Sequence, residues 1–345
     1  MQRLWYSFLR LYVRVGLHFY FKRIIIHGRD NIPDGPVIFA ANHQNAFLDA
    51  LLIVCFTTPV THFLTRADIF KRPLVRWVIG TLNMIPIYRM RDGWQSLVEN
   101  QKTFDTCTEL FIKNEAVVIF PEGNHHGQRR IRLLTKGFAR LALEAMKKYP
   151  DLKISIVPVG LNYSAHQAFG SSVSVYFGPP IFVHDHGQGP AQITSLRDEL
   201  AARLKRLTTH IADADRYNEI INTLELSQPN YLDPIDTNER IDIIERGEVV
   251  RTTSSQPAGQ SLALLPLYFI ARALNFIPIL IWQIIKTKIK DPVFYSSIRF
   301  GVGIFLFPLY YLLIGTILYN VWGPLIGLGW CALAFASPFV LSRAT

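Results

Sequence analysis

The chain has 345 residues, 50% of them hydrophobic, and a formal net charge of +10. Its mean hydropathy of +0.19 is high for a purely soluble protein and favours membrane contact. The positive charge fits nucleic acid, anionic lipid or a phosphorylated substrate, but the sequence holds no nucleic-acid-binding motif, so lipid and phosphate are preferred. Three widely spaced cysteines, Cys55, Cys107 and Cys331, indicate a reducing compartment and argue against a disulfide or a zinc site.

Residues 1–25 predict an amphipathic helix that lies in a membrane interface. Aromatic and aliphatic residues cover most of its circumference, and the cations fall in one narrow stripe at helical spacing: Arg3, Arg10, Arg14, His18 and Lys22. The long cationic side chains of such a helix reach the lipid headgroups while its apolar face lies in the bilayer. The alternative is a surface helix packed on its own domain. We do not expect a signal peptide, because the cations interrupt any apolar run.

The run that follows holds a histidine and an aspartate in a pattern typical of acid–base chemistry. Val37–Ala41 has the length of a buried strand, and an apolar helical pattern begins a few residues later, for which Asn42 or Asn45 is the expected N-cap. His43 lies between the two elements, and Asp49 lies one turn into the helix. The carboxylate of such a pair holds imidazole Nδ1–H while Nε2 takes a proton. The alternative is a polar turn between two buried elements.

Two arginines are expected at the ends of strands. Residues 62–65 predict a short strand before Arg66, and a second apolar strand ends at Arg89. A guanidinium group at a strand end suits bidentate contact with a phosphate. The alternative is that Arg89 forms a salt bridge with Asp92 or is an unpaired arginine on the surface. Residues 94–113 then predict an amphipathic helix.

A buried strand over 116–120 leads into the loop PEGNHHGQRRIRLLTKG. Glu122 stands at the strand end, and Gly123 can adopt a positive φ or let a backbone N–H approach a ligand closely. The adjacent His125 and His126 lack the carboxylate or cysteine spacing of a recognised metal site, so we expect no metal. The cations that follow predict a dense positive lining: Arg129, Arg130, Arg132 and Lys136.

The remaining elements of this region follow with turn signals between them. Residues 154–159 and 173–177 predict buried strands, and Pro158 implies that the first of them lies at an edge or ends there. Residues 195–226 are helical in pattern, with an apolar line of leucines. Residues 229–260 are polar and turn-rich and predict a linker.

In this order the motifs resemble those of the glycerolipid acyltransferases, the family of the lysophosphatidate and glycerol-3-phosphate acyltransferases. His43 and Asp49 resemble its NH-x4-D motif, with five residues in place of four between them, as in some eukaryotic-type glycerol-3-phosphate acyltransferases. Positions six apart do not share a helix face, so His43 must lie on the turn before the helix. Phe120–Gly123 matches the FPEG motif without a gap, and 154–163 resembles the fourth motif. The likeness covers residues 36–182.

The resemblance implies a fold and a set of roles. The fold is α/β, a glycerol-3-phosphate acyltransferase-type mixed sheet wrapped by helices. His43 takes the proton from the acceptor hydroxyl and Asp49 orients the imidazole, with neither a metal nor a redox cofactor. Glu122 orients the acceptor hydroxyls or neutralises Arg89 when no substrate is bound, and the N–H of Gly123 assists the oxyanion. Three cations bind the acceptor phosphate: Arg89, helped by Arg66 and Lys136.

The tail predicts a membrane region. Residues 302–319 and 321–341 are uncharged and long enough to cross a bilayer, and Asn320 is nearly the whole loop between them. The cations on either side of this hairpin place both of its ends on the cytoplasmic side. Residues 262–285 are apolar as well but contain Arg272, and an arginine near mid-membrane costs about 2.5–3.5 kcal/mol. We therefore expect a broken, interfacial or re-entrant segment there.

Four regions follow: an interfacial helix over 1–25, a catalytic domain over 26–190, a helical extension and linker over 191–260, and a membrane region over 261–345. The predicted function is a multi-pass membrane acyltransferase with its catalytic domain on the cytoplasmic side. It moves a fatty acyl group from acyl-CoA or acyl carrier protein to glycerol-3-phosphate or lysophosphatidate, towards phosphatidic acid. The alternatives are a hydrolase of acyl thioesters or lipid esters on the same fold, and a catalytically silent lipid-binding protein.

Overall fold

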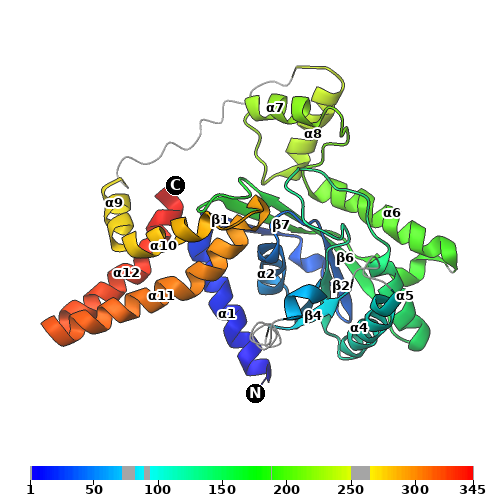
Figure 1. Ribbon diagram of the computed structural model, residues 1–345. Coiled ribbons are helices and arrows are strands. Elements are labelled where there is room, and N and C mark those ends of the chain that lie inside the picture. Colours follow the sequence, from blue (N-terminus) through cyan, green and yellow to red (C-terminus); the bar gives the residue numbers. More distant parts are fainter. Residues whose placement is uncertain (1, 72–81, 89–93, 188, 250–264, 345) are drawn as a thin grey trace.

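The computed structural model describes residues 2–71, 82–88, 94–187, 189–249 and 265–344, and the described strands form one eight-stranded sheet (Figure 1). They lie in the order β1-β7-β6-β2-β5-β3-β4, with β8 beside β6. Neighbouring strands are parallel except where β6 meets β7 and β8, so the mixed sheet expected from the sequence is confirmed. The strands are β1 Arg23–His27, β2 Val37–Ala41, β3 Thr61–Arg66, β4 Met84–Ile87, β5 Ala116–Ile119, β6 Ser155–Tyr163, β7 Ser172–Phe177 and β8 Ile181–Phe182.

The central strands bring two loops to one edge of the sheet. β2 pairs in parallel with β5 on one side and β6 on the other, with Ala40 opposite both Ile119 and Pro158. Their carboxyl ends therefore lie side by side, at the edge where open α/β sheets bind ligands. The turn after β2 carries His43 and the loop after β5 carries Glu122. The register alone thus makes these two residues neighbours.

Helices cover both faces of the sheet, because the strands alternate their side chains between two cores. In β2, for example, Phe39 faces a core that α1 and α2 close, and Ile38 faces a core that α4, α5 and α6 close. This arrangement confirms the helix-wrapped sheet that the family resemblance implied. The helices are α1 Gln2–Tyr20, α2 Phe47–Phe56, α4 Trp94–Ile112, α5 Gly137–Lys148 and α6 Pro190–Leu207.

The N-terminal helix is shorter than predicted. α1 ends at Tyr20, and the next residues of the range assigned to it begin β1, an edge strand paired with β7. A short apolar run such as that of β1 has no periodicity that separates strand from helix. At one end of α1 Leu17 is fully buried in the core, whereas Trp5 and Phe8 at the other end are exposed. α1 is therefore packed on its own domain and also presents an apolar end, whose place in a membrane interface stays a prediction.

Pro158 lies inside the central strand β6, so the expected edge or strand end is wrong. On the flank of β6 away from β2, β8 pairs with Ser155 and Ile156, and β7 pairs with the segment that begins at Val159. Pro158 falls in the gap between these partners, where its carbonyl accepts the N–H of Gly178 at 2.9 Å. Because the N–H and C=O positions of one strand residue point to the same side, the missing N–H faces this gap, at the point where the ladder with β7 ends.

The range 229–260, predicted as a linker, contains a helix. α8 (Pro234–Glu245) packs against α7 (Tyr217–Leu226) around a small core of their own. The side chain of Asp233 caps α8 by accepting two backbone N–H groups at the helix start. The two helices form a lobe at the top of Figure 1. An aspartate followed by a proline was the sequence signal for this helix start.

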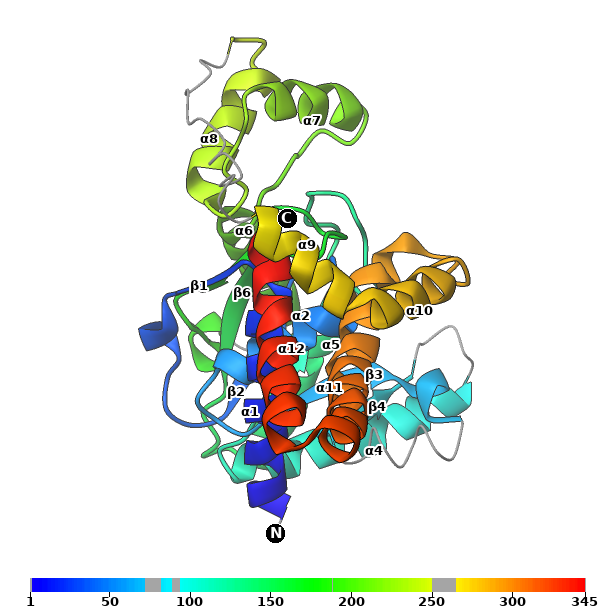
Figure 2. The ribbon, with the colours of Figure 1, turned by 90° about the vertical axis from the view of Figure 1, so that its left-hand side faces the viewer.

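The tail is a helical hairpin that projects from one side of the molecule (Figure 1) and faces the viewer in Figure 2. α11 (Tyr295–Trp322) and α12 (Pro324–Ala344) are each long and apolar enough to cross a membrane. Asn320 does not form the loop as predicted, because it still lies within α11. The turn is at Gly323, whose φ of 90° belongs to the left-handed region that favours glycine.

A bent pair of helices precedes this hairpin. α9 (Leu265–Leu274) and α10 (Phe276–Lys286) meet at 74° around Asn275. The side chain of Asn275 is fully buried, donates to Ser337 Oγ at 2.6 Å and accepts the hydroxyl of Tyr311. These bonds tie the bend to the hairpin. The broken segment expected from the sequence is confirmed, whereas its lie in a membrane plane stays a prediction.

Candidate active site

The turn after β2, residues 42–49 and hereafter the catalytic turn, places His43 against Asp49. His43 Nδ1 lies 2.9 Å from Asp49 Oδ2. α2 begins only at Phe47, so His43 precedes the helix and Asp49 lies in its first turn. The extra residue is absorbed at Ala46, whose φ of 46° with ψ of −128° is strained for a residue that carries a Cβ. The longer spacing therefore still forms the pair, through a strained turn.

Both oxygens of the Asp49 carboxylate are hydrogen-bonded, and the residue is fully buried. Besides His43, Oδ2 accepts the backbone N–H groups of Gln44 at 2.9 Å and Asn45 at 2.8 Å, while Oδ1 accepts the hydroxyl of Tyr163 at 2.5 Å. A carboxylate only accepts, so His43 donates through Nδ1–H, and its Nε2 carries the free lone pair. This arrangement is a base with a fixed tautomer. Nothing in the sequence pattern pointed to Tyr163, which lies at the end of β6.

The two asparagines expected to cap α2 serve other purposes. Asn42 is buried and exchanges two hydrogen bonds with the backbone of Leu161 in β6. Asn45 donates from its side chain to the carbonyl of His166. The helix start is instead held by Ser297 of α11, which accepts the N–H of Leu48 at 3.0 Å and donates to the carbonyl of Asn45 at 2.6 Å. The first turn of the tail helix therefore positions the catalytic turn.

The FPEG loop after β5 lies directly on His43. The Phe120 ring stacks on the imidazole with 3.9 Å between ring centroids. Glu122 is buried, accepts the backbone N–H of His43 at 3.2 Å through one oxygen and pairs with Arg132 Nε at 3.0 Å through the other. Gly123 has a φ of 78°, and its N–H donates to the carbonyl of Phe120 at 3.0 Å. That N–H, assigned by the resemblance to the oxyanion, is thus engaged in the turn of the loop.

Three cations beside this loop, Arg66, Arg132 and Lys136, are named here the cationic rim. Arg66 ends β3, is exposed and pairs with Asp68 at 3.1 Å. Lys136 is exposed immediately before α5, and among the described residues no contact joins it to the catalytic turn. Arg132 is partly buried through its pair with the FPEG loop. Arg89, which the family resemblance assigned to the acceptor phosphate, lies outside the described residues. Asp92, its partner in the alternative interpretation, does so as well.

Arg129 does not belong to the positive lining that the sequence predicted. It is only 7% exposed, and its guanidinium lies over the ring of Tyr231, 3.3 Å from the centroid. It donates to the carbonyl of Tyr163 at 3.0 Å, and its backbone N–H donates to the hydroxyl of Tyr217. Burial lowers its pKa. Arg129 therefore links the α7–α8 lobe to the end of β6. Its guanidinium group contacts other parts of the protein and does not contribute to the predicted positive lining.

A segment of the tail completes the wall around the base. His125 lies edge-on to His43, with 5.8 Å between ring centroids, and edge-on to Phe294, with 4.6 Å. His125 Nε2 is 3.4 Å from Asp291 Oδ2. Burial and then His43 lower the pKa of His125, Asp291 opposes them, and Arg66 adds a smaller lowering effect. No sequence signal connected the tail to this site.

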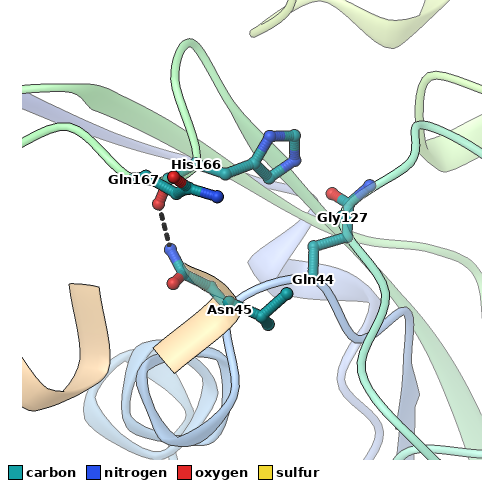
Figure 3. A pocket seen from close by; sticks show the side chains of 6 residues that line it. Gln44, Asn45, Gly127, His166 and Gln167 are labelled. Carbon is teal, nitrogen blue, oxygen red and sulfur yellow. Dashed lines mark hydrogen bonds between the residues drawn. The ribbon is translucent and has the colours of Figure 1, made fainter. Parts of the chain in front are cut away.

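A cavity of about 250 Å³ lies beside the catalytic turn (Figure 3). Asn45 and His166 meet at its wall through the bond from Asn45 Nδ2 to the His166 carbonyl, 2.9 Å long. Burial lowers the pKa of His166 to about 3, so its imidazole is neutral at physiological pH. The wall is uncharged and combines polar side chains with the apolar Val293; it consists of Gln44, Asn45, Gly127, His166, Gln167 and Val293.

Comparison with known proteins shows what this part of the chain is similar to. Residues 23–162 match the family model described as Acyltransferase. Similar proteins include glycerol-3-phosphate O-acyltransferase 1 of Saccharomyces cerevisiae, 30% identical over 34% of this chain and 16% of its own length. A chloroplastic 1-acyl-sn-glycerol-3-phosphate acyltransferase of Arabidopsis thaliana is 27% identical over 44% of this chain and 39% of its own length. The chain thus spans less than two fifths of each of these two relatives.

A bacterial relative matches a larger share of the chain, and one solved structure is also similar. The 1-acyl-sn-glycerol-3-phosphate acyltransferase of Pseudomonas aeruginosa is 24% identical over 55% of this chain and 70% of its own length. The crystal structure of the 1-acyl-sn-glycerophosphate acyltransferase of Thermotoga maritima is similar at 19% identity and a TM-score of 0.41, over 53% of this chain and 70% of that one.

Proposed function

We propose that this chain is a membrane-bound O-acyltransferase of phosphatidic acid synthesis, because residues 23–162 match the Acyltransferase family model and similar proteins include glycerol-3-phosphate and 1-acyl-sn-glycerol-3-phosphate acyltransferases. It moves a fatty acyl group from acyl-CoA or acyl carrier protein to glycerol-3-phosphate or 1-acyl-glycerol-3-phosphate. The observation that carries the proposal is the His43–Asp49 pair at the carboxyl end of β2, with Nε2 of the imidazole left free.

The reaction proceeds by direct transfer between donor and acceptor. His43 Nε2 removes the proton of the acceptor hydroxyl as that oxygen attacks the thioester carbonyl, and the buried carboxylate of Asp49 stabilises the imidazolium. When the intermediate collapses, the carbon–sulfur bond breaks and the thiolate takes the proton back from Nε2. Among the described residues no serine or cysteine hydrogen-bonds to His43, which supports transfer without an acyl-enzyme.

The acceptor phosphate binds at the cations around the FPEG loop. Arg89 is the principal ligand in this proposal, helped by Arg66 and Lys136, and its assignment rests on the family pattern. The position of Arg66 supports its assignment to the phosphate site, because its charge lowers the pKa of His125, which lies beside the proposed base. Glu122 accepts the backbone N–H of His43 and pairs with Arg132 of the rim. It therefore holds the proposed base in place relative to the proposed phosphate site.

The hairpin of α11 and α12 spans the membrane in this proposal, with the catalytic domain, residue 290 and the C-terminus on the cytoplasmic side. The acyl thioester and glycerol phosphate are cytosolic, so the catalytic domain must face the cytosol. Ser297 in the first turn of α11 bonds to the catalytic turn, which supports placing the start of the hairpin on the same side as the base. The cations between α10 and α11 agree with this orientation.

Cysteine labelling from outside intact cells tests this topology, after replacement of the three native cysteines. We expect labelling of Trp322→Cys at the hairpin turn and none of Lys290→Cys or Arg343→Cys. Labelling of Lys290→Cys from outside would contradict the orientation, and equal protection of all three positions would contradict the span.

The activity is tested by incubating the purified protein with labelled acyl-CoA or acyl carrier protein, with and without a panel of acceptors. New lipid is the expected product, whereas free fatty acid would assign the site to hydrolysis and no product would leave a silent lipid-binding protein. His43→Ala should lower turnover by about 10²-fold or more. His62→Ala is the matched control, because His62 also pairs with a carboxylate, Glu115 at 2.7 Å, but outside the catalytic turn. Equal turnover of the two variants would refute the assignment of the base.

A further inference from the structure

An apolar chamber of about 390 Å³ lies among α1, α9, α10, α11 and α12, a group of helices that Figure 2 shows on one face of the molecule. Its volume falls within the range of about 300–1,000 Å³ that is common for small-molecule sites. Neither His43 nor Asp49 lines it, so it is separate from the catalytic turn. Its walls are largely aromatic and aliphatic and include Phe19, Phe169, Phe300, Phe307, Phe335 and Leu341.

Two cations line this chamber without a carboxylate partner. Arg272 donates to the hydroxyl of Tyr268 at 3.1 Å, and Arg299 lies over the ring of Trp282, 4.7 Å from its centroid. Among the described residues neither arginine forms an ion pair with an acid. Asp291 is the one acidic residue between 265 and 344, and it is paired with a histidine beside the base. The chain itself therefore supplies no counter-charge here.

Three buried polar groups that line the chamber lack a hydrogen-bond partner among the described residues: the N–H groups of Trp282 and Arg299, which are donors, and the hydroxyl of Tyr20, which can donate or accept. Trp282 is 7% exposed, and its Nε1 has no hydrogen-bond partner among the described residues. The Nε of Arg299 is also buried without one. A buried N–H group without a partner is unfavourable unless an acceptor satisfies it, and Arg272, which is exposed, adds a second positive charge to the lining of the same chamber. The walls in turn suit a hydrocarbon chain, so the ligand that fits both features is an anionic amphiphile.

We propose that this chamber binds one anionic glycerophospholipid, with an acyl chain against the aromatic walls and the phosphate at Arg272 and Arg299. A phosphate offers several acceptor oxygens to a guanidinium group, and Trp282 Nε1 donates to the same head group. The lipid occupies a site of its own, beyond acyl transfer at His43, and joins α1 and the bent helices to the hairpin.

Mass spectrometry of the intact full-length protein, released from detergent micelles, counts the bound lipids. Wild-type protein should retain one dioleoyl phosphatidylglycerol at a concentration at least about tenfold below that needed for dioleoyl phosphatidylcholine. Arg272→Gln combined with Arg299→Gln should abolish this preference. Lys288→Gln combined with Lys290→Gln removes the same charge from exposed positions outside the chamber and should keep it. Equal retention of the two lipids by wild type, or equal loss in both double variants, would overturn the proposal.

Two glycines of α11 provide a second, steric test. A Cβ added to either Gly303 or Gly301 meets no atom within 4 Å, but only Gly303 lines the chamber. Gly303→Leu should fill the space and weaken binding of both lipids about tenfold, whereas Gly301→Leu should bind as wild type. Thermal unfolding in detergent establishes that each variant is folded. An unchanged affinity in Gly303→Leu would refute the chamber as the site.

Two further arms distinguish the lipid site from the catalytic turn and from a simple anion site. His43→Ala should retain phosphatidylglycerol as wild type does, so the result does not depend on whether acyl transfer is found. Inorganic phosphate should not displace the lipid, because it makes no contact with the apolar walls. Full displacement by phosphate alone would show an anion site without a chain site and would contradict a lipid ligand.

Discussion

In the catalytic turn both oxygens of the Asp49 carboxylate are bonded and the group is buried, whereas in the cationic rim the charges are exposed or held by single acids. The imidazole of His43 is thus held in one orientation and one tautomer before substrate binds, so the proposed proton transfer requires no rearrangement of this side chain. Arg66 and Arg132 instead rest in ion pairs with Asp68 and Glu122, which an incoming phosphate must compete with. In the proposed mechanism, proton transfer is therefore more strongly preorganised than acceptor binding. Changes in the turn should therefore act on kcat, and changes at the rim on KM.

The largest effect is expected from Asp49→Asn. An amide in place of the carboxylate turns a donor towards the N–H groups of Gln44 or Asn45, or leaves His43 in the other tautomer. We expect kcat to fall by about 10²- to 10⁴-fold, measured with labelled acyl donor. Asp68→Asn, which alters an exposed pair of the rim, is the control and should keep kcat. A folded Asp49→Asn protein with normal kcat would remove the catalytic turn from the mechanism.

Tyr163→Phe removes a single donor from the same carboxylate. A hydrogen bond to a charged group contributes about 1.5–3 kcal/mol, so we expect kcat to fall about tenfold or more while both KM values stay unchanged. Tyr231→Phe is matched to it, because the Tyr231 hydroxyl also donates to a carboxylate at 2.5 Å, that of Glu225 in the α7–α8 lobe. An equal fall of kcat in both variants would mean that tyrosine loss acts through the fold and not through Asp49.

Ser297→Ala tests whether the tail positions the turn. The hydroxyl bridges the N–H of Leu48 and the carbonyl of Asn45, and its loss should lower kcat about three- to tenfold. Ser296→Ala loses a bond to the carbonyl of His166 instead and should change kcat less. Ser297→Thr keeps the hydroxyl and should restore kcat. A rise of KM with unchanged kcat would place Ser297 with the rim and not with the turn.

The smallest effect on kcat is expected from the arginines that we propose bind the acceptor phosphate. Arg89→Lys keeps the charge but loses the planar fork, so acceptor KM should rise about three- to tenfold while the KM of the thioester stays nearly constant. Arg66→Lys is the comparison within the described rim, and its effect should be smaller because its guanidinium already pairs with Asp68. Equal rises of the two KM values in Arg89→Lys would show a structural role for this arginine.

Much of the site could be predicted because its parts are local in sequence. An apolar run that ends in a histidine, an aspartate in the following helix, and the FPEG loop after another buried strand each occupy a few consecutive residues. Parallel strands with the same register then bring His43 and Glu122 to one edge of the sheet. The two apolar helices of the tail were equally predictable, because length and hydropathy alone indicate a helix that can cross a bilayer.

The candidate base, its carboxylate, the strand ends near which they lie and the apolar helices of the tail could all be predicted from the amino-acid sequence. Only the tertiary structure decided that Tyr163 and Ser297, 114 and 249 positions from the residues they bond, hold the catalytic turn. It also decided that Arg129 is a buried anchor and not a substrate ligand. The physical reason is that hydrophobic periodicity encodes which face of an element is buried, but not which distant polar group satisfies a buried donor or acceptor.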